Sequence, residues 1–122
     1  MIKKSILIID DDIILLKTAE EILSDLYSVS VAKGGKQGIT LLKKGIIPNL
    51  ILLDIAMPEM DGYQATEMIR NLGDSRAAVP IVAMTANAFE EDRQKALNAG
   101  MNAHVSKPVD MNVLFRVMAK FI

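Results

Sequence analysis

Two stretches of the chain, Ile6-Leu-Ile-Ile-Asp-Asp-Asp12 and Leu50-Ile-Leu-Leu-Asp54, decide the fold. Each is a run of four large apolar residues that stops at an aspartate. A short run without polar alternation is typical of a strand buried on both faces, as in a parallel sheet covered by helices. The sequence therefore predicts an α/β protein in which carboxylates follow two of the strands.

Apolar segments of the same kind recur along the chain and alternate with stretches of helical spacing. The predicted strands are Ile6–Ile9, Tyr27–Val31, Leu50–Leu53, Ile81–Met84 and Ala103–Ser106. The first predicted helix contains the stripe Leu15, Ala19, Ile22 and Leu26, supported by Leu16 and Leu23 beside it. The other predicted helices contain the segment Gly38–Lys44, the stripe Tyr63, Met68, Ile69 and Leu72 ended by Gly73, the segment Phe89–Ala99, and the stripe Leu114, Val117, Met118 and Phe121. The second strand alternates serine with valine, as a half-exposed edge strand does. Because each helix supplies a crossover, we expect a doubly wound, five-stranded parallel sheet.

Length and composition limit the function classes. The 122 residues suit a single domain over 1–122, and 51% hydrophobic residues are ample for a core. With 14 basic and 15 acidic side chains, the charge balance argues against direct nucleic-acid binding. The absence of cysteine excludes disulfides, thiolate metal sites and cysteine nucleophiles. Since no apolar run reaches the roughly 18 residues of a membrane span, we expect a cytoplasmic protein without membrane insertion.

Polar side chains follow the predicted strands where ligands bind in an open α/β sheet, at the carboxyl ends. Asp10 and Asp11 follow the first strand, Asp54 the third, Thr85 the fourth and Lys107 the fifth. Carboxylates from neighbouring strands repel one another unless one is protonated or a cation binds between them. An all-oxygen ligand set favours Mg²⁺. A hydroxyl and an ammonium beside these groups predict a phosphoryl group covalently bound to the third-strand aspartate.

Four segments in this order resemble the receiver domain of the response regulators of two-component signalling. They are Ile6–Asp12, Asp54–Gly62, Met84–Ala86 and Ser106–Pro108. The resemblance extends over essentially the whole chain. It implies a flavodoxin-like (βα)5 fold with strand order 2-1-3-4-5, as in the chemotaxis response regulator.

The resemblance also implies the roles of the acidic residues. Asp54 matches the phosphoacceptor of the family, and Asp10 and Asp11 match its acidic pair. Mg²⁺ is expected to bind Asp10, Asp11, Asp54 and the backbone carbonyl of Ala56, with Asp10 acting through water. The cofactor implied is therefore Mg²⁺ alone.

The remaining motif residues match the switch of the family. Thr85 corresponds to the switch hydroxyl and Lys107 to the phosphoryl-binding ammonium, and the Lys107–Pro108 bond is cis in the family pattern. The family often has an aromatic residue at position 104, where this chain has His104. A switch role and a plain, partly buried, hydrogen-bonded side chain are weighed equally for this histidine.

The predicted function is a phosphorylation-dependent switch rather than a turnover enzyme. A histidine kinase or phosphotransfer protein would donate the phosphoryl group, and the fourth helix, fifth strand and fifth helix would form the readout face for a downstream protein. The segment Thr85–Asp92 resembles receivers of hybrid sensor kinases, and a stand-alone protein and a piece of a larger one both remain open. One alternative is a Mg²⁺ phosphatase of the haloacid dehalogenase type, which Asp10 and Asp12 suit but Ile14 does not. The other is a receiver-like interaction module that is never phosphorylated.

Overall fold

The computed structural model describes residues 3–86 and 90–122, without the side chains of Glu90 and Glu91. Within these residues a single parallel sheet has the strand order β2-β1-β3-β4-β5. The strands are β1 (Ser5–Ile9), β2 (Ser28–Ala32), β3 (Leu50–Asp54), β4 (Ile81–Thr85) and β5 (Ala103–Ser106). The helices are α1 (Ile13–Leu23), α2 (Gly35–Lys43), α3 (Gly62–Arg70), α4 (Glu90–Ala99) and α5 (Met111–Met118), with a 3-10 helix at Ser75–Ala78. The predicted doubly wound sheet and its order are confirmed.

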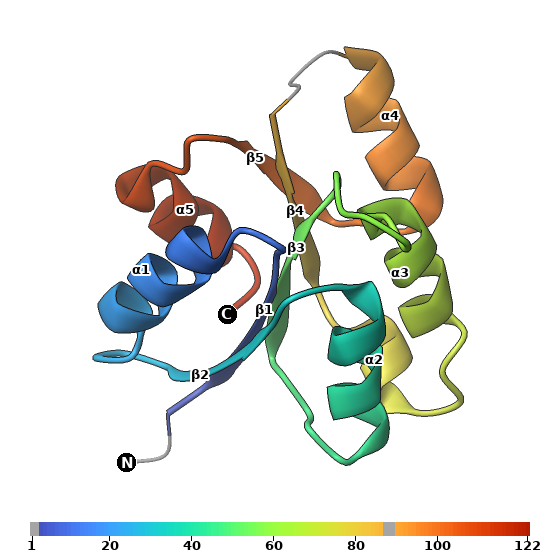
Figure 1. Ribbon diagram of the computed structural model, residues 1–122, viewed down its shortest axis with the longest axis horizontal. Coiled ribbons are helices and arrows are strands. Elements are labelled where there is room, and N and C mark those ends of the chain that lie inside the picture. Colours follow the sequence, from blue (N-terminus) through green and yellow to red (C-terminus); the bar gives the residue numbers. More distant parts are fainter. Residues whose placement is uncertain (1–2, 87–89) are drawn as a thin grey trace.

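Two helical layers cover the sheet. Helices α1 and α5 lie on one face, and α2, α3 and α4 lie on the other (Figure 1). Because successive strand residues point to opposite faces, Ile6 and Ile8 pack beneath the first layer and Leu7 and Ile9 beneath the second. This two-sided burial explains the unbroken apolar runs of the sequence. None of the helices in the described part of the chain is long and apolar enough to cross a bilayer.

The buried stripe of α1 agrees with the predicted one only in part. Leu16, Ala19 and Leu23 face the core, whereas Ile22 is 40% exposed and Leu26 is 60% exposed. The Asp12 side chain caps the helix by accepting hydrogen bonds from the first-turn N–H groups, so the helix starts at Ile13. It ends at Leu23, and Ser24 is its C-cap. Two apolar stripes with helical spacing overlap in this segment, and the pattern alone does not choose between them.

Other helix ends also differ from prediction. Helix α2 begins at Gly35, three residues before the predicted start, and α3 ends at Arg70 rather than at Gly73. Asn71 is the C-cap of α3 and does not have a left-handed backbone conformation. Its N–H donates to carbonyls of the last turn of the helix. The 3-10 helix that follows was not predicted. The predicted first residue of the fourth helix, Phe89, lies outside the described residues.

A half-buried arginine, Arg70, joins three segments at the amino ends of β4 and β5. The Arg70 guanidinium donates to the Gly100 carbonyl at 2.9 Å, to the Asn102 side chain at 2.8 Å, and to two carbonyls before β4 at 2.6 and 3.0 Å. The Asn102 side chain also accepts the first N–H of β4. Arg70 therefore connects α3 to the loops that enter β4 and β5, at the end of the sheet opposite the acidic residues.

Candidate functional site

The carboxyl ends of β1 and β3 place Asp10 and Asp54 side by side. Ile9 pairs with Leu53 in the parallel register, so the next residue of each strand lies level with its neighbour. Asp10 has no exposed surface, and Asp54 is 3% exposed. Asp11 is exposed, and one carboxylate oxygen from each of the three aspartates lies within 4.8 Å of the others. The acidic cluster predicted from the sequence therefore forms.

Lys107 bridges the two buried carboxylates. Its Nζ lies 2.8 Å from Oδ2 of Asp10 and 3.2 Å from Oδ1 of Asp54. The Lys107 N–H donates to the Thr85 carbonyl at 2.8 Å, which holds the end of β5 against β4. The bond to Pro108 is cis, as the family pattern implies. The ammonium thus enters the acidic cluster from the next-but-one strand, because β4 separates β3 from β5.

Burial and like charge shape the electrostatics of this cluster. Burial, and then the charge of Asp10, raise the pKa of Asp54 to about 7, although Lys107 opposes this. Burial disfavours the charged form of Lys107, but its pairing with Asp10 and Asp54 outweighs this effect and raises its pKa. One ammonium therefore does not neutralise the cluster near neutral pH. A second cation, or a proton on Asp54, would complete the charge balance.

The donor set of the cluster fits a hard divalent ion. Oδ1 of Asp10 accepts the Asp12 N–H at 2.9 Å. Oδ2 of Asp10 is buried and accepts no well-directed hydrogen bond from the described residues, although the Lys107 ammonium is within ion-pairing distance. This oxygen retains lone pairs for a cation beside the carboxylates of Asp11 and Asp54. Carboxylate oxygens with room for water are the ligands that Mg²⁺ prefers.

Thr85 and His104 lie on one face of the sheet. Thr85 ends β4 and is buried, and His104 pairs in register with Ala83, two residues earlier in β4. Since residues two apart in a strand share a face, the side chains of Thr85 and His104 are both on the face that α4 covers. His104 is half-buried and lines a cavity of about 260 Å³ between α4, β5 and α5. Their placement is compatible with either reading of His104.

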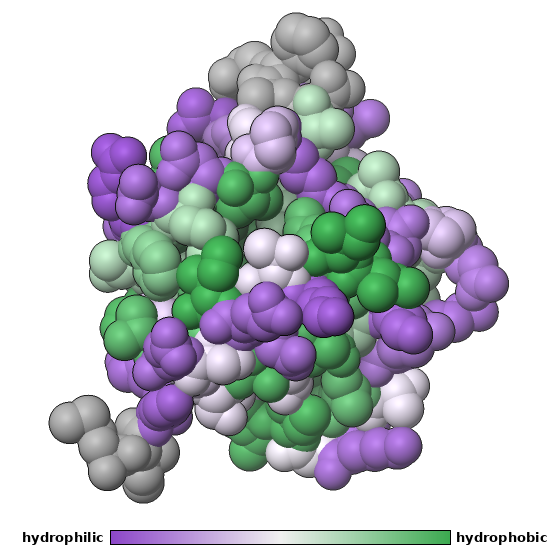
Figure 2. Space-filling model, turned by 60° about the vertical axis from the view of Figure 1, so that its left-hand side comes forward, coloured by the Kyte–Doolittle hydropathy of each residue, from purple (hydrophilic) through white to green (hydrophobic). Residues whose placement is uncertain are grey.

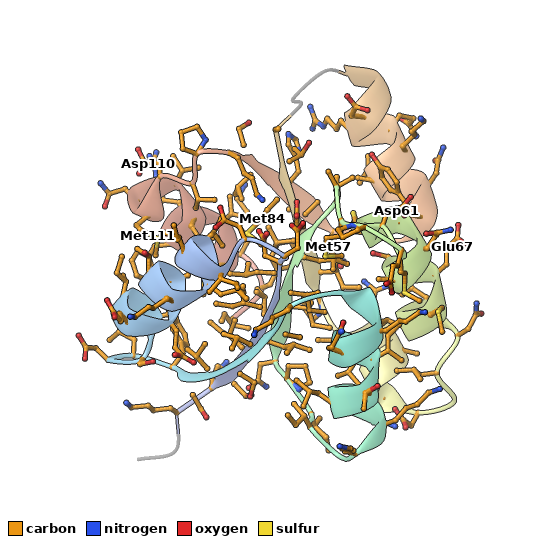
Figure 3. The ribbon with its side chains drawn as sticks, viewed as in Figure 1. Met57, Asp61, Glu67, Met84, Asp110 and Met111 are labelled. Atoms are coloured by element: carbon orange, nitrogen blue, oxygen red, sulfur yellow. The ribbon has the colours of Figure 1, made fainter. Side chains whose placement is uncertain are left out.

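Gly62 is a site residue for which the sequence predicts no role. Its N–H donates to the Ile55 carbonyl at 2.8 Å, and a Cβ at this position would lie 2.5 Å from the Asp54 carbonyl oxygen. Only glycine lets the first turn of α3 approach the chain beyond Asp54 so closely. The sequence signal for this role is the Asp61-Gly62 pair. Asp61 caps α3, and Gly62 allows the close approach. Met57 and Met84, labelled in Figure 3, supply buried apolar surface beside this strand end.

Comparison with known proteins identifies the family. A family model described as the response regulator receiver domain matches residues 6–119. The chain belongs to this family. It is 38% identical over 117 residues to the sensor histidine kinase RcsC of Salmonella typhimurium, a match that covers 95% of this chain and 12% of the kinase. This receiver domain therefore spans a small part of that relative, and the activity of the whole kinase does not transfer to it.

Solved structures agree with this assignment. The chemotaxis protein CheY4 of Vibrio cholerae has a TM-score of 0.91 at 22% identity, with 98% of this chain and 99% of that chain covered, which shows the fold. The receiver domain of a Pseudomonas aeruginosa sensor histidine kinase has a TM-score of 0.85 at 33% identity, with 98% and 97% covered. That crystal structure has a magnesium ion coordinated in its active site cleft. The family match thus favours a receiver domain over the haloacid dehalogenase alternative.

Proposed function

We propose that Asp54 accepts a phosphoryl group from a phosphohistidine of a partner protein and that the chain, over 1–122, acts as a signalling switch rather than a turnover enzyme. The observation that best supports this proposal is the buried Asp10–Asp54 pair bridged by Lys107. A carboxylate oxygen of Asp54 attacks phosphorus, the phosphorus–nitrogen bond to the donor imidazole breaks, and that nitrogen retains the electron pair. Attack needs the ionised carboxylate, which Lys107 favours and burial opposes.

The acidic cluster supports a Mg²⁺ site at the same place. Asp10, Asp11, Asp54 and the backbone carbonyl of Ala56 would hold the ion. When bound, Mg²⁺ supplies positive charge to the peripheral oxygens of the transferring phosphoryl group. Lys107 supplies a further positive charge, because its ammonium already lies 3.2 Å from Asp54.

Charge added at Asp54 acts on the neighbouring strand ends. We assign to Thr85 a hydrogen bond to the phosphoryl group and to Lys107 an ion pair with it, so that both side chains are drawn toward Asp54. His104 shares the sheet face of Thr85, which supports a switch role for it. The readout face is then formed by α4, β5 and α5, and the partner that binds there is a downstream protein.

Exposed apolar residues beside the site support a protein donor, either a histidine kinase or a phosphotransfer protein. Ile13 and Ile14, in the first turn of α1, are 60% and 77% exposed. A groove of about 520 Å³ between α1 and α5 extends from Ile14 to Lys107. Figure 2 shows apolar patches among polar side chains on the face that contains these helices. A donor bound to these patches would cover the site. We place the phosphoryl transfer in the cytoplasm, where ATP supplies the kinase with phosphoryl groups.

Mass spectrometry after exposure to acetyl phosphate or phosphoramidate tests the proposal. One adduct of phosphate mass on Asp54, formed with Mg²⁺ and absent from Asp54→Asn, is the expected result. Many turnovers of a phosphate ester per protein would instead support a phosphatase. The absence of any adduct in Mg²⁺ would support the unphosphorylated interaction module.

A further inference from the structure

The outer edge of β2 is an unpaired strand edge. β2 is the terminal strand of the sheet, and in the described part of the chain it pairs with β1 alone. The Ser28 N–H donates to the Lys4 carbonyl at 2.9 Å, so the backbone groups of Ser28 face β1. Because backbone direction alternates along a strand, the N–H and C=O groups of Val29 and Val31 face away from β1. This edge therefore offers hydrogen-bonding groups to a further strand.

The strand lacks the usual protection of an exposed edge. Natural edge strands are blocked by charged side chains, proline or a bulge. Residues 27–32, Tyr-Ser-Val-Ser-Val-Ala, contain neither charge nor proline, and their pairing with β1 has no bulge. Tyr27, Val29 and Val31 pack only partly against the core beneath α1 and α5. Their exposed surface forms an apolar strip along the edge.

Opposite charges lie at the two ends of this apolar strip. Asp25 precedes the strip and Lys33 follows it, and both side chains are exposed. Neither of them forms an ion pair with another described residue. In an antiparallel pair of two such strands, the Lys33 end of one strand meets the Asp25 end of the other. The edge of β2 is therefore complementary in charge to a second copy of itself.

We propose that two copies of the chain pair through β2, antiparallel and with two-fold symmetry, with Val29 on the symmetry axis. Each Val29 N–H then donates to the Val29 carbonyl of the other copy. At each end, the Val31 N–H donates to the Tyr27 carbonyl of the other copy. The Tyr27 N–H takes no part in the pairing, because it already donates to the Leu23 carbonyl at 2.8 Å. Val31 and Tyr27 also become cross-strand neighbours on one sheet face, a favourable aromatic and β-branched pair.

The flanking charges choose between two symmetric registers. With Val29 on the axis, Lys33 lies beside the turn that contains Asp25 of the second copy. With Ser30 on the axis, Lys33 lies opposite Tyr27, and both charges stay unpaired. The outward backbone groups meet in either register, so the hydrogen bonds alone do not choose. Charge complementarity therefore favours the axis at Val29.

This pairing leaves the acidic cluster accessible. Antiparallel strands place the two clusters at opposite ends of one continuous sheet, and the readout face lies at β5, the margin farthest from β2. The inference therefore does not depend on the proposed function. A single strand edge buries less surface than a standard interface, so we expect a weak dimer, with a Kd on the order of 100 μM.

Sedimentation equilibrium between about 10 μM and 1 mM chain tests the pairing. Lys33→Glu brings acids together and should raise the Kd of the dimer at least about threefold, and adding Asp25→Lys should restore it. Lys43→Glu, at the exposed end of α2, is the matched control and should leave the Kd unchanged. A wild-type chain that stays monomeric up to 1 mM, or a double variant that does not recover, would overturn the inference.

Disulfide cross-linking tests the register, because the chain contains no cysteine of its own. In the proposed register Ser28 lies opposite Ser30 of the second copy, in a non-hydrogen-bonded pair whose Cα separation suits a disulfide. A mixture of Ser28→Cys and Ser30→Cys chains should cross-link in air faster than either variant alone. Ser75→Cys, at an exposed serine elsewhere, measures chance collisions.

Two cross-linking outcomes would refute the proposal. Faster linking of Ser30→Cys with itself would put the axis at Ser30, and a mixture no faster than Ser75→Cys would exclude pairing through β2. Labelling of Asp54 by acetyl phosphate should be the same in Lys33→Glu as in the wild type. A chain that is labelled but does not dimerise refutes this inference alone, whereas a wild-type chain that dimerises without being labelled refutes the proposed function alone.

Discussion

The ammonium of Lys107 lies 2.8 Å from a carboxylate oxygen of Asp10, a side chain with no exposed surface. It is nearer to this oxygen than to Asp54, at 3.2 Å. In the absence of other cations, Lys107 is therefore the main counter-charge of Asp10. A divalent ion that binds Asp10 would free the ammonium to pair with groups attached to Asp54.

The raised pKa of Asp54 predicts stability that falls as pH rises. Folding shifts this pKa from 3.8 to about 7, so between these values the folded chain holds a proton that the unfolded chain has released. The contribution of Asp54 to stability is full below about pH 4 and is lost as pH rises through about 7. Urea unfolding at pH 5 and pH 8 in a metal chelator measures this loss, which Asp54→Asn should reduce. An equal pH dependence in the variant would contradict the assignment, and Mg²⁺ should restore wild-type stability at pH 8.

Removal of the Lys107 ammonium should be far more costly than removal of a surface ammonium. Lys107→Met leaves two buried carboxylates without their counter-charge, which we expect to lower the free energy of unfolding by about 3 kcal/mol at pH 8 without Mg²⁺. Lys36→Met is the control, because Lys36 pairs with Glu59 at 3.6 Å with both side chains largely exposed, and such pairs contribute about 1 kcal/mol or less. Similar losses in the two variants, measured by urea unfolding, would refute the buried pairing.

Glycine at position 62 should be needed for packing, not for backbone freedom. In Gly62→Ala the new methyl group would lie 2.5 Å from the Asp54 carbonyl oxygen, and we expect a loss of about 1–3 kcal/mol of stability with slower labelling of Asp54. Gly73→Ala is the matched control, because a Cβ there meets no atom within 4 Å. That substitution should be neutral or stabilising by up to about 1 kcal/mol. Thermal unfolding of both variants measures the contrast, and equal melting temperatures would contradict it.

Ile14 should matter for a protein donor and not for a small one. Because this side chain is 77% exposed, Ile14→Glu should preserve the fold while placing a charge on the predicted docking patch. We expect transfer from a phosphorylated donor protein to slow about tenfold or more, with unchanged labelling by acetyl phosphate. Ile47→Glu, at a side chain 66% exposed, is the control. If both variants accept phosphoryl groups from the protein donor at the wild-type rate, the donor does not dock on α1.

The sequence predicts those parts of the fold that depend on local chemistry. The apolar runs that end at Asp10 and Asp54 specify buried parallel strands, and the parallel register then brings the two carboxylates together. The buried face of α1 was predicted in part: Leu16, Ala19 and Leu23 are buried, whereas Ile22 and Leu26 of the predicted stripe are exposed. Apolar spacing alone does not decide which of two overlapping stripes of a helix faces the sheet.

The sequence predicts which residues form the site, but not which of them pair with one another. The sequence places an ammonium near carboxylates, but the preference of Lys107 for Asp10 over Asp54 depends on distances that only the folded chain sets. The same holds for Gly62, whose close contact is with a carbonyl eight residues earlier in the chain. The roles of Thr85, Ala56 and His104 remain predictions.

The Arg70 network has a consequence for how the domain opens. Its four hydrogen bonds tie α3, the entry to β4 and the entry to β5 into one unit, whereas β2 lies at the opposite margin of the sheet. Amide protons of β4 and β5 should exchange with deuterium only in global unfolding, while those of β2 exchange through smaller local openings. The strands β4 and β5, which carry the proposed switch residues, are then also the strands that open locally least often.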